Sequence, residues 1–190
     1  MISIVAYKAS WTNEFLEKGR MLRNFLGNLA PRIDHIGSTS VPGLSAKDVI
    51  DIQITVDRLS RNLESAMNPA VFQRLSNITR DHLSPGKDAD AHKWQKWFFQ
   101  PASVGRRVNV HVRLHGRANP RYAILFRDYL RAFPAIAQAY GRVKEVIVTN
   151  HPEQDMEAYY DLKDPVCDII NAGAEQWAVA TNWQAGPSDC

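Results

Sequence analysis

The stretch RIDHIGSTSVPGLSAKDVIDIQITV, residues 32–56, decides the fold. A short apolar run over 33–36 ends at Gly37, and a polar loop leads into a second apolar run over 49–56. Apolar and polar residues alternate in the second run, which is typical of a strand with one buried face and places Asp51 on the other face. The pattern therefore predicts two strands joined through a Gly-Ser turn, with a carboxylate projecting beside that turn.

The Gly-Ser turn has the composition of a phosphate-binding loop. Gly37 has no Cβ, so the backbone there can turn sharply and approach a ligand closely. Ser38, Thr39 and Ser40 add hydroxyls and cluster backbone N–H groups, a surface that receives phosphate oxygens. A carboxylate such as Asp51 next to bound phosphates would most usefully hold Mg²⁺. The alternative is a solvated strand face beside an ordinary Ser/Thr-rich loop. A Gly-Ser turn taken alone favours this alternative, because such turns are common.

Apolar periodicity predicts the other elements. We expect strands over the ranges 3–6, 93–100 and 107–114, and a loop over 82–92. We expect helices over the ranges 11–29, 57–73, 122–133, 134–150 and from 152 onward. Asp164-Pro165 should end one helix and start the next, because an interior proline breaks the hydrogen-bond ladder. These elements predict one α+β domain over residues 1–190, a small mixed sheet flanked by helices with a helical C-terminal half.

The strand expected over 107–114 has one polar face. Asn109, His111 and Arg113 alternate there with aliphatic residues. Because this strand and the 49–56 strand both separate aliphatic from polar residues, we expect Asp51 and His111 to converge in one cleft. His115 lies four residues after His111, but no third ligand has a convincing spacing, so we expect no zinc site.

The composition is that of an ordinary globular protein. Hydrophobic residues make up 45% and charged residues 23%. No apolar run approaches the roughly 18 residues that span a bilayer, and the first residues lack the features of a signal peptide, so no membrane partner is expected. Cys167 and Cys190 offer no disulfide framework, which favours a cytoplasmic location.

Positive charge is concentrated in the middle of the chain. Between Lys87 and Arg131 there are ten lysines and arginines against three aspartates, a net +7, so the remainder of the +3 chain carries −4. A basic segment of this kind suggests an anionic partner such as phosphates or RNA, and a solvated face with scattered arginines is the alternative. If RNA binds, Arg113, Arg117 and Arg121 should line its path.

Several stretches of the sequence resemble a known family. The ten residues HIGSTSVPGL, 35–44, together with Ala46-Lys47 and Ile50-Asp51-Ile52, are similar to the signature of the GrpB family, which is assigned to the nucleotidyltransferase (polymerase-β-like) superfamily. The likeness continues through Asn109–Val112, Leu125–Arg131, Lys144 and Tyr160–Lys163. Related domains of this family occur fused to dephospho-CoA kinases. The resemblance therefore implies a nucleotidyltransferase-like fold far more strongly than an activity.

The resemblance also implies a metal site that this chain does not complete. The superfamily's pattern has two carboxylates alternating on a strand and a third on a later strand, which together bind two metals. Asp51 matches the first, but Gln53 stands at the second position and the later strand offers no carboxylate. At most a weak Mg²⁺ site at Asp51 is expected, which Gln53→Asp should tighten. Glu153 and Glu157 are the only candidate replacements.

Three functions remain open. The first is a transferase acting on a nucleotide-linked substrate, with a catalytic group formed by Asp51, His111 and Gln53. The second is tRNA-dependent aminoacyl transfer, as in cyclodipeptide-forming enzymes, which needs a basic RNA track but no metal pair. The third is a non-catalytic nucleotide-binding module. The residues expected to hold a phosphate or nucleotide are Gly37, Ser38, Thr39, Ser40 and Lys47, and those expected to contact substrate or RNA are Asn109, Arg113, Arg117 and Arg121.

Overall fold

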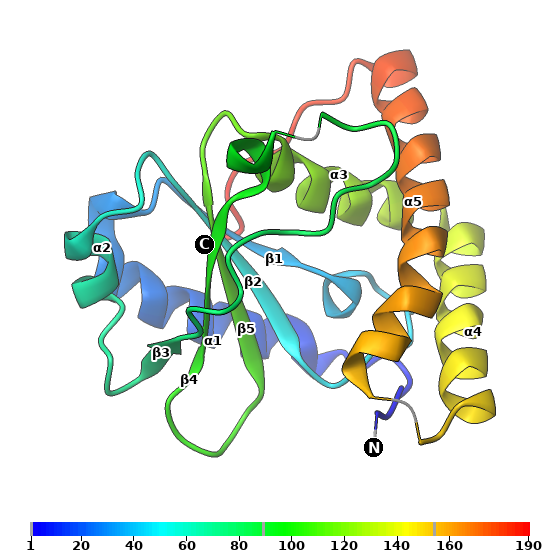
Figure 1. Cartoon of the computed structure of the whole chain (residues 1–190), viewed down its shortest axis with the longest axis horizontal. Helices are drawn as coiled ribbons and strands as arrows, with labels where there is room; N and C mark the ends of the chain where they lie inside the picture. The colour runs from blue at the N-terminus through cyan, green and yellow to red at the C-terminus, as the bar shows by residue number, and fades with distance from the viewer. Residues whose placement is uncertain (1, 89, 154) are drawn as a thin grey trace.

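The computed structural model describes residues 2–88, 90–153 and 155–190. Its centre is a five-stranded mixed sheet with the strand order β1-β2-β5-β4-β3, flanked by helices (Figure 1). The strands are β1 (Arg32–Ile36), β2 (Ile50–Val56), β3 (Phe72–Arg74), β4 (Lys96–Pro101) and β5 (Val108–Leu114). Only the central pair β2–β5 is parallel among these strands. The predicted α+β class is confirmed.

Five α-helices accompany the sheet in the described part of the chain. They are α1 (Ser10–Leu26), α2 (Arg61–Ala66), α3 (Ala118–Ala132), α4 (Pro134–Asn150) and α5 (Met156–Thr181). Helix α1 packs on β1 and β2, whereas α3 contacts β1 and β5 and also packs against α4 and α5 (Figure 1). Short 3-10 turns lie at Gly27–Leu29, Ser38–Ser40 and Ala91–Trp94. The helical C-terminal half thus forms one wall beside the sheet.

The alternation of β2 produces the main core. Ile50, Ile52 and Ile54 are fully buried in the same apolar cluster as Trp11 and Phe15 of α1. Burying a side chain of this size contributes about 1.5–3 kcal/mol. The opposite, polar face of β2 is not the solvated face of the alternative interpretation, because Gln53 and Thr55 are also buried. Of the three polar residues, only Asp51 is more than a tenth exposed.

Two N-terminal predictions differ from the structure. The strand expected over 3–6 is a single bridge between Val5 and Ala46. The helix expected over 57–73 is only α2, which Ser60 caps by accepting a hydrogen bond from the Leu63 N–H. Asn68 then adopts a φ of +52°, which a helix does not continue through, and β3 follows.

The predicted break at Pro165 is wrong, because α5 runs through it. An interior proline removes one backbone hydrogen bond and costs about 3 kcal/mol. Buried residues on both sides of it, including Tyr159 and Cys167, pack the helix against its neighbours and offset this cost. Asp155 caps the start of the helix by accepting from the Ala158 N–H at 2.9 Å. Tertiary packing therefore overrides the local signal.

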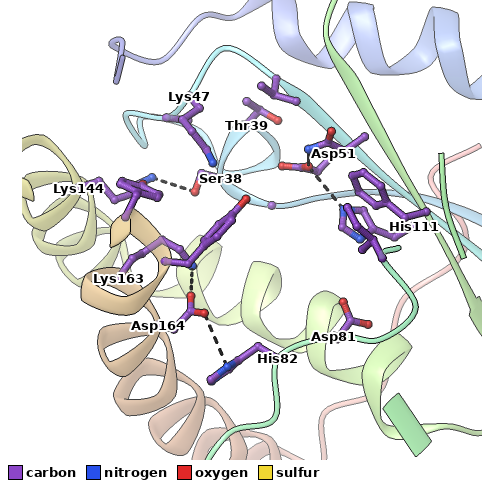
Figure 2. A pocket seen from close by; sticks show the side chains of 18 of the residues that line it. Ser38, Thr39, Lys47, Asp51, Asp81, His82, His111, Lys144, Lys163 and Asp164 are labelled. Atoms are coloured by element: carbon purple, nitrogen blue, oxygen red, sulfur yellow. Dashed lines mark hydrogen bonds and ion pairs between the residues drawn. The ribbon is translucent and has the colours of Figure 1, made fainter. Parts of the chain in front are cut away.

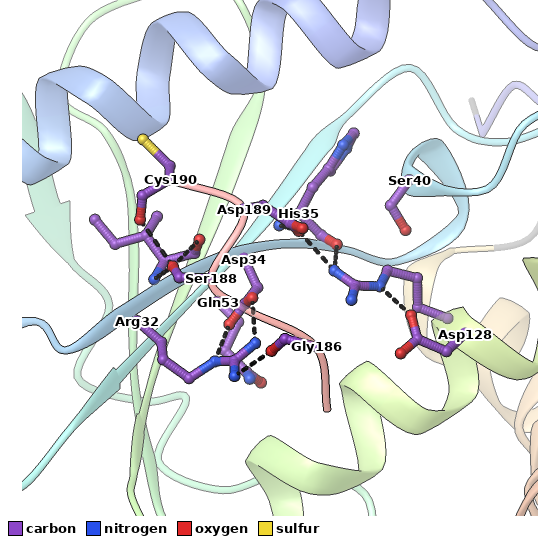
Figure 3. Close-up of polar contacts among 12 residues, drawn as sticks. Arg32, Asp34, His35, Ser40, Gln53, Asp128, Gly186, Ser188, Asp189 and Cys190 are labelled. Carbon is purple, nitrogen blue, oxygen red and sulfur yellow. Dashed lines mark hydrogen bonds and ion pairs between the residues drawn. The ribbon is translucent and has the colours of Figure 1, made fainter. Parts of the chain in front are cut away.

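The chain after α5 crosses back to β1 and covers its open edge (Figure 3). The Cys190 N–H donates to the Ile33 carbonyl at 3.1 Å, and Asp189 accepts from the His35 N–H at 2.9 Å. Asp189 also accepts from Arg127 at 2.6 Å. An unpaired strand edge is a template for unwanted pairing, so these bonds protect β1. Within the described chain no helix combines the length and apolarity needed to cross a bilayer.

Candidate functional site

A cavity of about 500 Å³ lies where β2 and β5 meet the turn after β1, the loop before β4, and helices α4 and α5 (Figure 2). Seven of the residues singled out in the sequence line it: Gly37, Ser38, Thr39, Lys47, Asp51, Asn109 and His111. Charged and aromatic residues to which the sequence gave no role also line it: Arg80, Asp81, His82, Lys96, Tyr140, Lys144, Tyr159, Tyr160, Lys163 and Asp164. The cavity is therefore polar, with lysines on several sides.

The turn after β1 brings the backbone against Asp51. Gly37 has φ +70° and ψ −175°, a conformation open essentially to glycine alone. A Cβ on Gly37 would lie 2.5 Å from the Asp51 Oδ2, so the missing side chain makes room for the carboxylate. The Ser40 hydroxyl donates to the Gly37 carbonyl at 2.6 Å and fixes the turn. Ser40 thus supports the turn and does not line the cavity.

Asp51 and His111 converge, as expected from the alternation of their strands. The Asp51 Oδ1 accepts a hydrogen bond from the Asn109 amide at 2.9 Å and lies 3.7 Å from the His111 Nε2. Burial acts to raise the pKa of Asp51, but these donors and the charge of Lys47 outweigh it and lower the pKa. Asp51 is therefore ionised at neutral pH.

The surroundings of His111 fix which of its nitrogens carries the proton. Its Nδ1 faces the Lys96 Nζ and the Arg113 Nη2, each at 3.4 Å, and both groups can only donate. The proton therefore sits on Nε2 and points toward Asp51. Burial, reinforced by these two cations, lowers the pKa of His111 to about 4 against the opposing effect of Asp51. His111 is therefore neutral, with its Nε2–H turned toward Asp51 at a distance longer than a hydrogen bond.

Asp81 ties the loop before β4 to the sheet. It accepts from Arg113 at 2.8 and 2.7 Å, from Lys96 at 2.8 Å and from Asn119 at 2.9 Å. Burial opposes ionisation, but Arg113 and Lys96 hold the pKa of Asp81 far below its usual range. No motif marks this aspartate in the sequence, because its partners lie 15 to 38 residues away.

The structure does not support the roles expected for Gln53 and Arg113. Gln53 is fully buried behind the cavity wall, accepts from the Arg113 Nη1 at 2.6 Å and donates to the Pro120 carbonyl at 3.2 Å. Arg113 is only 5% exposed and is held by Asp81 as well. Neither side chain lines the cavity, where a catalytic group or an RNA contact would lie. The tighter Mg²⁺ binding expected of Gln53→Asp stays a prediction.

Two lysines of the cavity lack a carboxylate partner within the described chain. The Lys144 Nζ donates to the Ser38 Oγ at 2.9 Å and to the Ser45 carbonyl at 2.5 Å. The Lys47 Nζ lies 4.9 Å from the ring centres of Tyr159 and Tyr160. Burial lowers the pKa of Lys144 to about 7 and that of Lys47 to about 8. The other two cavity lysines are neutralised, since Lys96 pairs with Asp81 and Lys163 pairs with Asp164.

Four further predicted residues lie outside the cavity. Arg121 is paired with Glu175 at 2.6 Å, and Arg117 is exposed at the start of α3. Glu153 and Glu157 are exposed at the start of α5 and do not replace the missing carboxylates. The expected RNA track of three arginines therefore does not form one surface that leads into the cavity.

The residues around Asp51 do not fit a two-metal centre. Among the residues that the structure describes, no three His, Cys, Asp or Glu side chains are grouped to hold a metal ion. The neighbours of Asp51 are donors, Asn109 and the Nε2–H of His111, which cannot ligate a cation with the atoms they present. A single Mg²⁺ shared between Asp51 and a bound phosphate stays a prediction.

Comparison with known proteins agrees with this fold. A dephospho-CoA kinase of Mycobacterium tuberculosis is 34% identical over 195 residues, which cover 95% of this chain and 48% of that protein. The chain thus spans about half the length of such relatives. The crystal structure of the conserved protein GrpB from Enterococcus faecalis superposes with a TM-score of 0.75 at 25% identity, covering 92% of this chain and 99% of that one.

A more distant solved structure shares the fold. The GLD-2/RNP-8 complex gives a TM-score of 0.51 at 13% identity and covers 84% of this chain and 58% of that one, which concerns the fold alone. The fold is nucleotidyltransferase-like. The model of the family described as GrpB protein matches residues 1–172, and those residues carry the turn, both cavity strands and the lysines of α4 and α5. The chain belongs to the GrpB protein family.

Proposed function

We propose that the cavity binds the phosphate of a nucleotide or nucleotide-linked small molecule and that the protein transfers a group to or from it. The observation that carries this proposal is Lys47, a half-buried cation without a carboxylate partner in the described chain, which reaches the cavity beside the Gly37–Ser38 turn (Figure 2). A phosphate would supply the missing negative charge. The fold adds support, because its neighbours are nucleotidyltransferase-like.

The turn supplies the complementary donors. No hydrogen bond found among the described residues uses the backbone N–H of Ser38 or Thr39, although Ser40 and Val41 donate within the turn. Two adjacent free N–H groups next to a lysine form a cradle for anionic oxygens. Ionised Asp51 lies on the other side of Gly37 and would repel a second phosphate there. The site therefore favours one phosphate at the turn, with the rest of the ligand toward Tyr160.

Calorimetry tests this proposal. We expect AMP, ATP or dephospho-CoA to bind and adenosine to bind far more weakly, because adenosine lacks the phosphate. Lys47→Met should weaken phosphate-ligand binding about tenfold, the value of one charge-assisted hydrogen bond of about 1.5 kcal/mol. Lys8→Met is the matched control, since Lys8 is an exposed lysine outside the cavity that pairs with Asp48.

Proton uptake gives a second readout. A bound phosphate raises the pKa of Lys47 from about 8, so binding above that pH takes up a proton. The apparent enthalpy should then depend on the ionisation enthalpy of the buffer, and this dependence should shrink in Lys47→Met. Equal affinities for AMP and adenosine, or equal effects of Lys47→Met and Lys8→Met, would contradict the proposal.

The alternative of tRNA-dependent aminoacyl transfer stays an untested prediction. Two of the three arginines on which it rested, Arg113 and Arg121, are paired with carboxylates. No observation in the cavity favours it over a small phosphate-bearing ligand.

A further inference from the structure

Ser38 and Lys144 make a contact that phosphate binding does not require. The Lys144 Nζ lies 2.9 Å from the Ser38 Oγ, although the two residues are 106 positions apart (Figure 2). Ser38 belongs to the turn after β1 and Lys144 to the middle of α4, so two packed elements fix the distance. Both residues line the cavity, but Lys144 is only 2% exposed. A hydroxyl that faces a cavity is thus backed by a buried amine.

The two contacts of Lys144 are compatible with its neutral form as well as with the ammonium ion. The Ser45 carbonyl can only accept, so one N–H of Lys144 points at it. The nitrogen lone pair of a neutral amine can then accept the Ser38 hydroxyl hydrogen. Burial lowers the pKa of Lys144 to about 7, so a large fraction of this lysine is neutral near neutral pH. A neutral lysine within reach of a serine hydroxyl is a general base next to a nucleophile.

Charged and titratable groups face Lys144 from three elements. Lys47, in the loop before β2, and Lys163, on α5, favour the neutral amine, whereas Cys167 on α5 and Glu145 on α4 favour the ammonium ion. The ring of Tyr140, also on α4, lies 4.6 Å from Nζ. The contact with Ser38 involves no carboxylate, so nothing in it requires the charged form.

Donors for a developing oxyanion lie on the same turn. The N–H groups of Ser38 and Thr39 make no hydrogen bond in the described chain, and they belong to the nucleophile and to the residue after it. When a serine attacks an ester, negative charge develops on the carbonyl oxygen, and fixed backbone donors beside the nucleophile stabilise that charge. The turn therefore carries both the nucleophile and its electrostatic support.

We propose that Ser38 is a nucleophile with Lys144 as its general base, and that the cavity accepts an activated acyl ester. Neutral Lys144 takes the Ser38 hydroxyl proton while Oγ forms a bond to the acyl carbon. The ester C–O bond breaks, its electron pair leaves with the alkoxide, and Lys144 returns the proton to that oxygen. Water or an acceptor nucleophile then releases the acyl group from Ser38.

An acyl group suits this pair better than a phosphoryl group. An anionic phosphoryl group beside Nζ would stabilise protonated Lys144 and remove the base. Phosphoryl transfer also relies on metal ions to neutralise developing charge, and the residues around Asp51 do not fit a metal pair. An ester carbonyl is uncharged before attack and leaves Lys144 neutral. The inference goes beyond the proposed phosphate site, since a small uncharged ester tests it without any phosphate.

The test uses p-nitrophenyl acetate and the full chain. We expect a stoichiometric burst of nitrophenolate, an acetyl group on Ser38 in the peptide mass spectrum, and a burst rate that rises with pH around a midpoint near 7. Ser38→Ala should abolish both signals. Lys144→Arg keeps a donor to Ser38 but is always protonated, so it should slow the burst roughly a hundredfold while circular dichroism stays unchanged. Ser103→Ala, in an exposed loop outside the cavity, is the control.

Three results would overturn the proposal. They are an unmodified Ser38 at a pH above 8 in the wild-type chain, a burst in Lys144→Arg as fast as in the wild type, and a burst rate that does not depend on pH between 6 and 8. If Lys144→Arg fails to fold, the wild-type pH profile and the mass spectrum still decide. Inorganic phosphate should slow acylation, because it competes for the same N–H groups, but a failure of phosphate to bind leaves the acylation result standing.

Discussion

Asp81→Asn should be among the most destabilising single substitutions near the cavity. Asp81 is the carboxylate partner of two nearly buried cations, Arg113 with 6% and Lys96 with 9% of the side chain exposed. Removing one partner of such a cluster leaves uncompensated charge and costs about 3–5 kcal/mol. The asparagine oxygen can still accept one neutral hydrogen bond, so we expect the lower part of this range. That is a large share of the roughly 5–15 kcal/mol that stabilises a typical domain.

Urea unfolding followed by circular dichroism measures this effect. With a slope of about 2 kcal/mol per molar urea, a loss of about 3 kcal/mol lowers the midpoint by roughly 1.5 M. The control is Glu145→Gln, which breaks an ion pair with Arg142 whose side chains are 41% and 75% exposed and should cost no more than about 0.5 kcal/mol. A loss below about 1 kcal/mol for Asp81→Asn would refute the inference that the cluster supports the site.

The pH dependence of the same variant checks the sign of the effect. The folded pKa of Asp81 lies below its ordinary value of 3.8, so its stabilisation is fully present above that value and is lost as the pH falls through the lower folded pKa. The difference between wild type and Asp81→Asn should therefore be constant from pH 5 to pH 8 and shrink only below about pH 4. A difference that already narrows between pH 7 and pH 5 would point to a different titrating group.

Two other substitutions probe the turn and the histidine. Gly43→Ala, which shares the positive φ but meets no atom within 4 Å, should cost only the backbone strain of about 1–2 kcal/mol. Gly37→Ala should lower stability by more than this strain, because its Cβ also displaces Asp51. Equal losses in urea unfolding and equal nucleotide affinities of the two variants would contradict the close approach of Gly37 to Asp51. In the wild type, the free energy of unfolding should fall as the pH drops from 6.5 toward 4, because His111 binds a proton in the unfolded chain but resists it in the folded one. His111→Gln should remove about 3 kcal/mol of this pH dependence between about pH 7 and pH 4. An unchanged dependence on pH in urea unfolding of the variant would contradict a buried neutral His111.

The sequence was sufficient for the elements whose signals are local. The alternation of β2 and β5 and the helical period of α1 predicted these elements, and the Gly-Ser turn with Asp51 and His111 lies where that alternation implies. Each of these features depends on the side-chain period of one segment. The family signature added Lys47, which also lines the cavity.

The features that the sequence missed or predicted wrongly depend on contacts between distant segments. Asp81 meets Arg113 across 32 residues, and Lys144 meets Ser38 across 106, and no spacing within one segment encodes such a meeting. Pro165 looked like a helix end because its local cost is visible in the sequence, whereas the packing that offsets it is not. The burial of Gln53 and Thr55 was not visible in the sequence, because α3, whose Pro120 carbonyl accepts from Gln53, begins more than 60 residues later.

The packing of α3 on the sheet explains why position 53 is a glutamine. Its Oε1 accepts from Arg113 at 2.6 Å and its Nε2 donates to the Pro120 carbonyl at 3.2 Å, at a place with no access to water. A carboxylate could accept from Arg113 but could not donate, so the Pro120 carbonyl would lose this donor. At position 53, where a metal pair would require a carboxylate, this chain therefore needs an amide. The contacts of this amide with Arg113 and the Pro120 carbonyl take the place of a second metal ligand and hold α3 against the sheet.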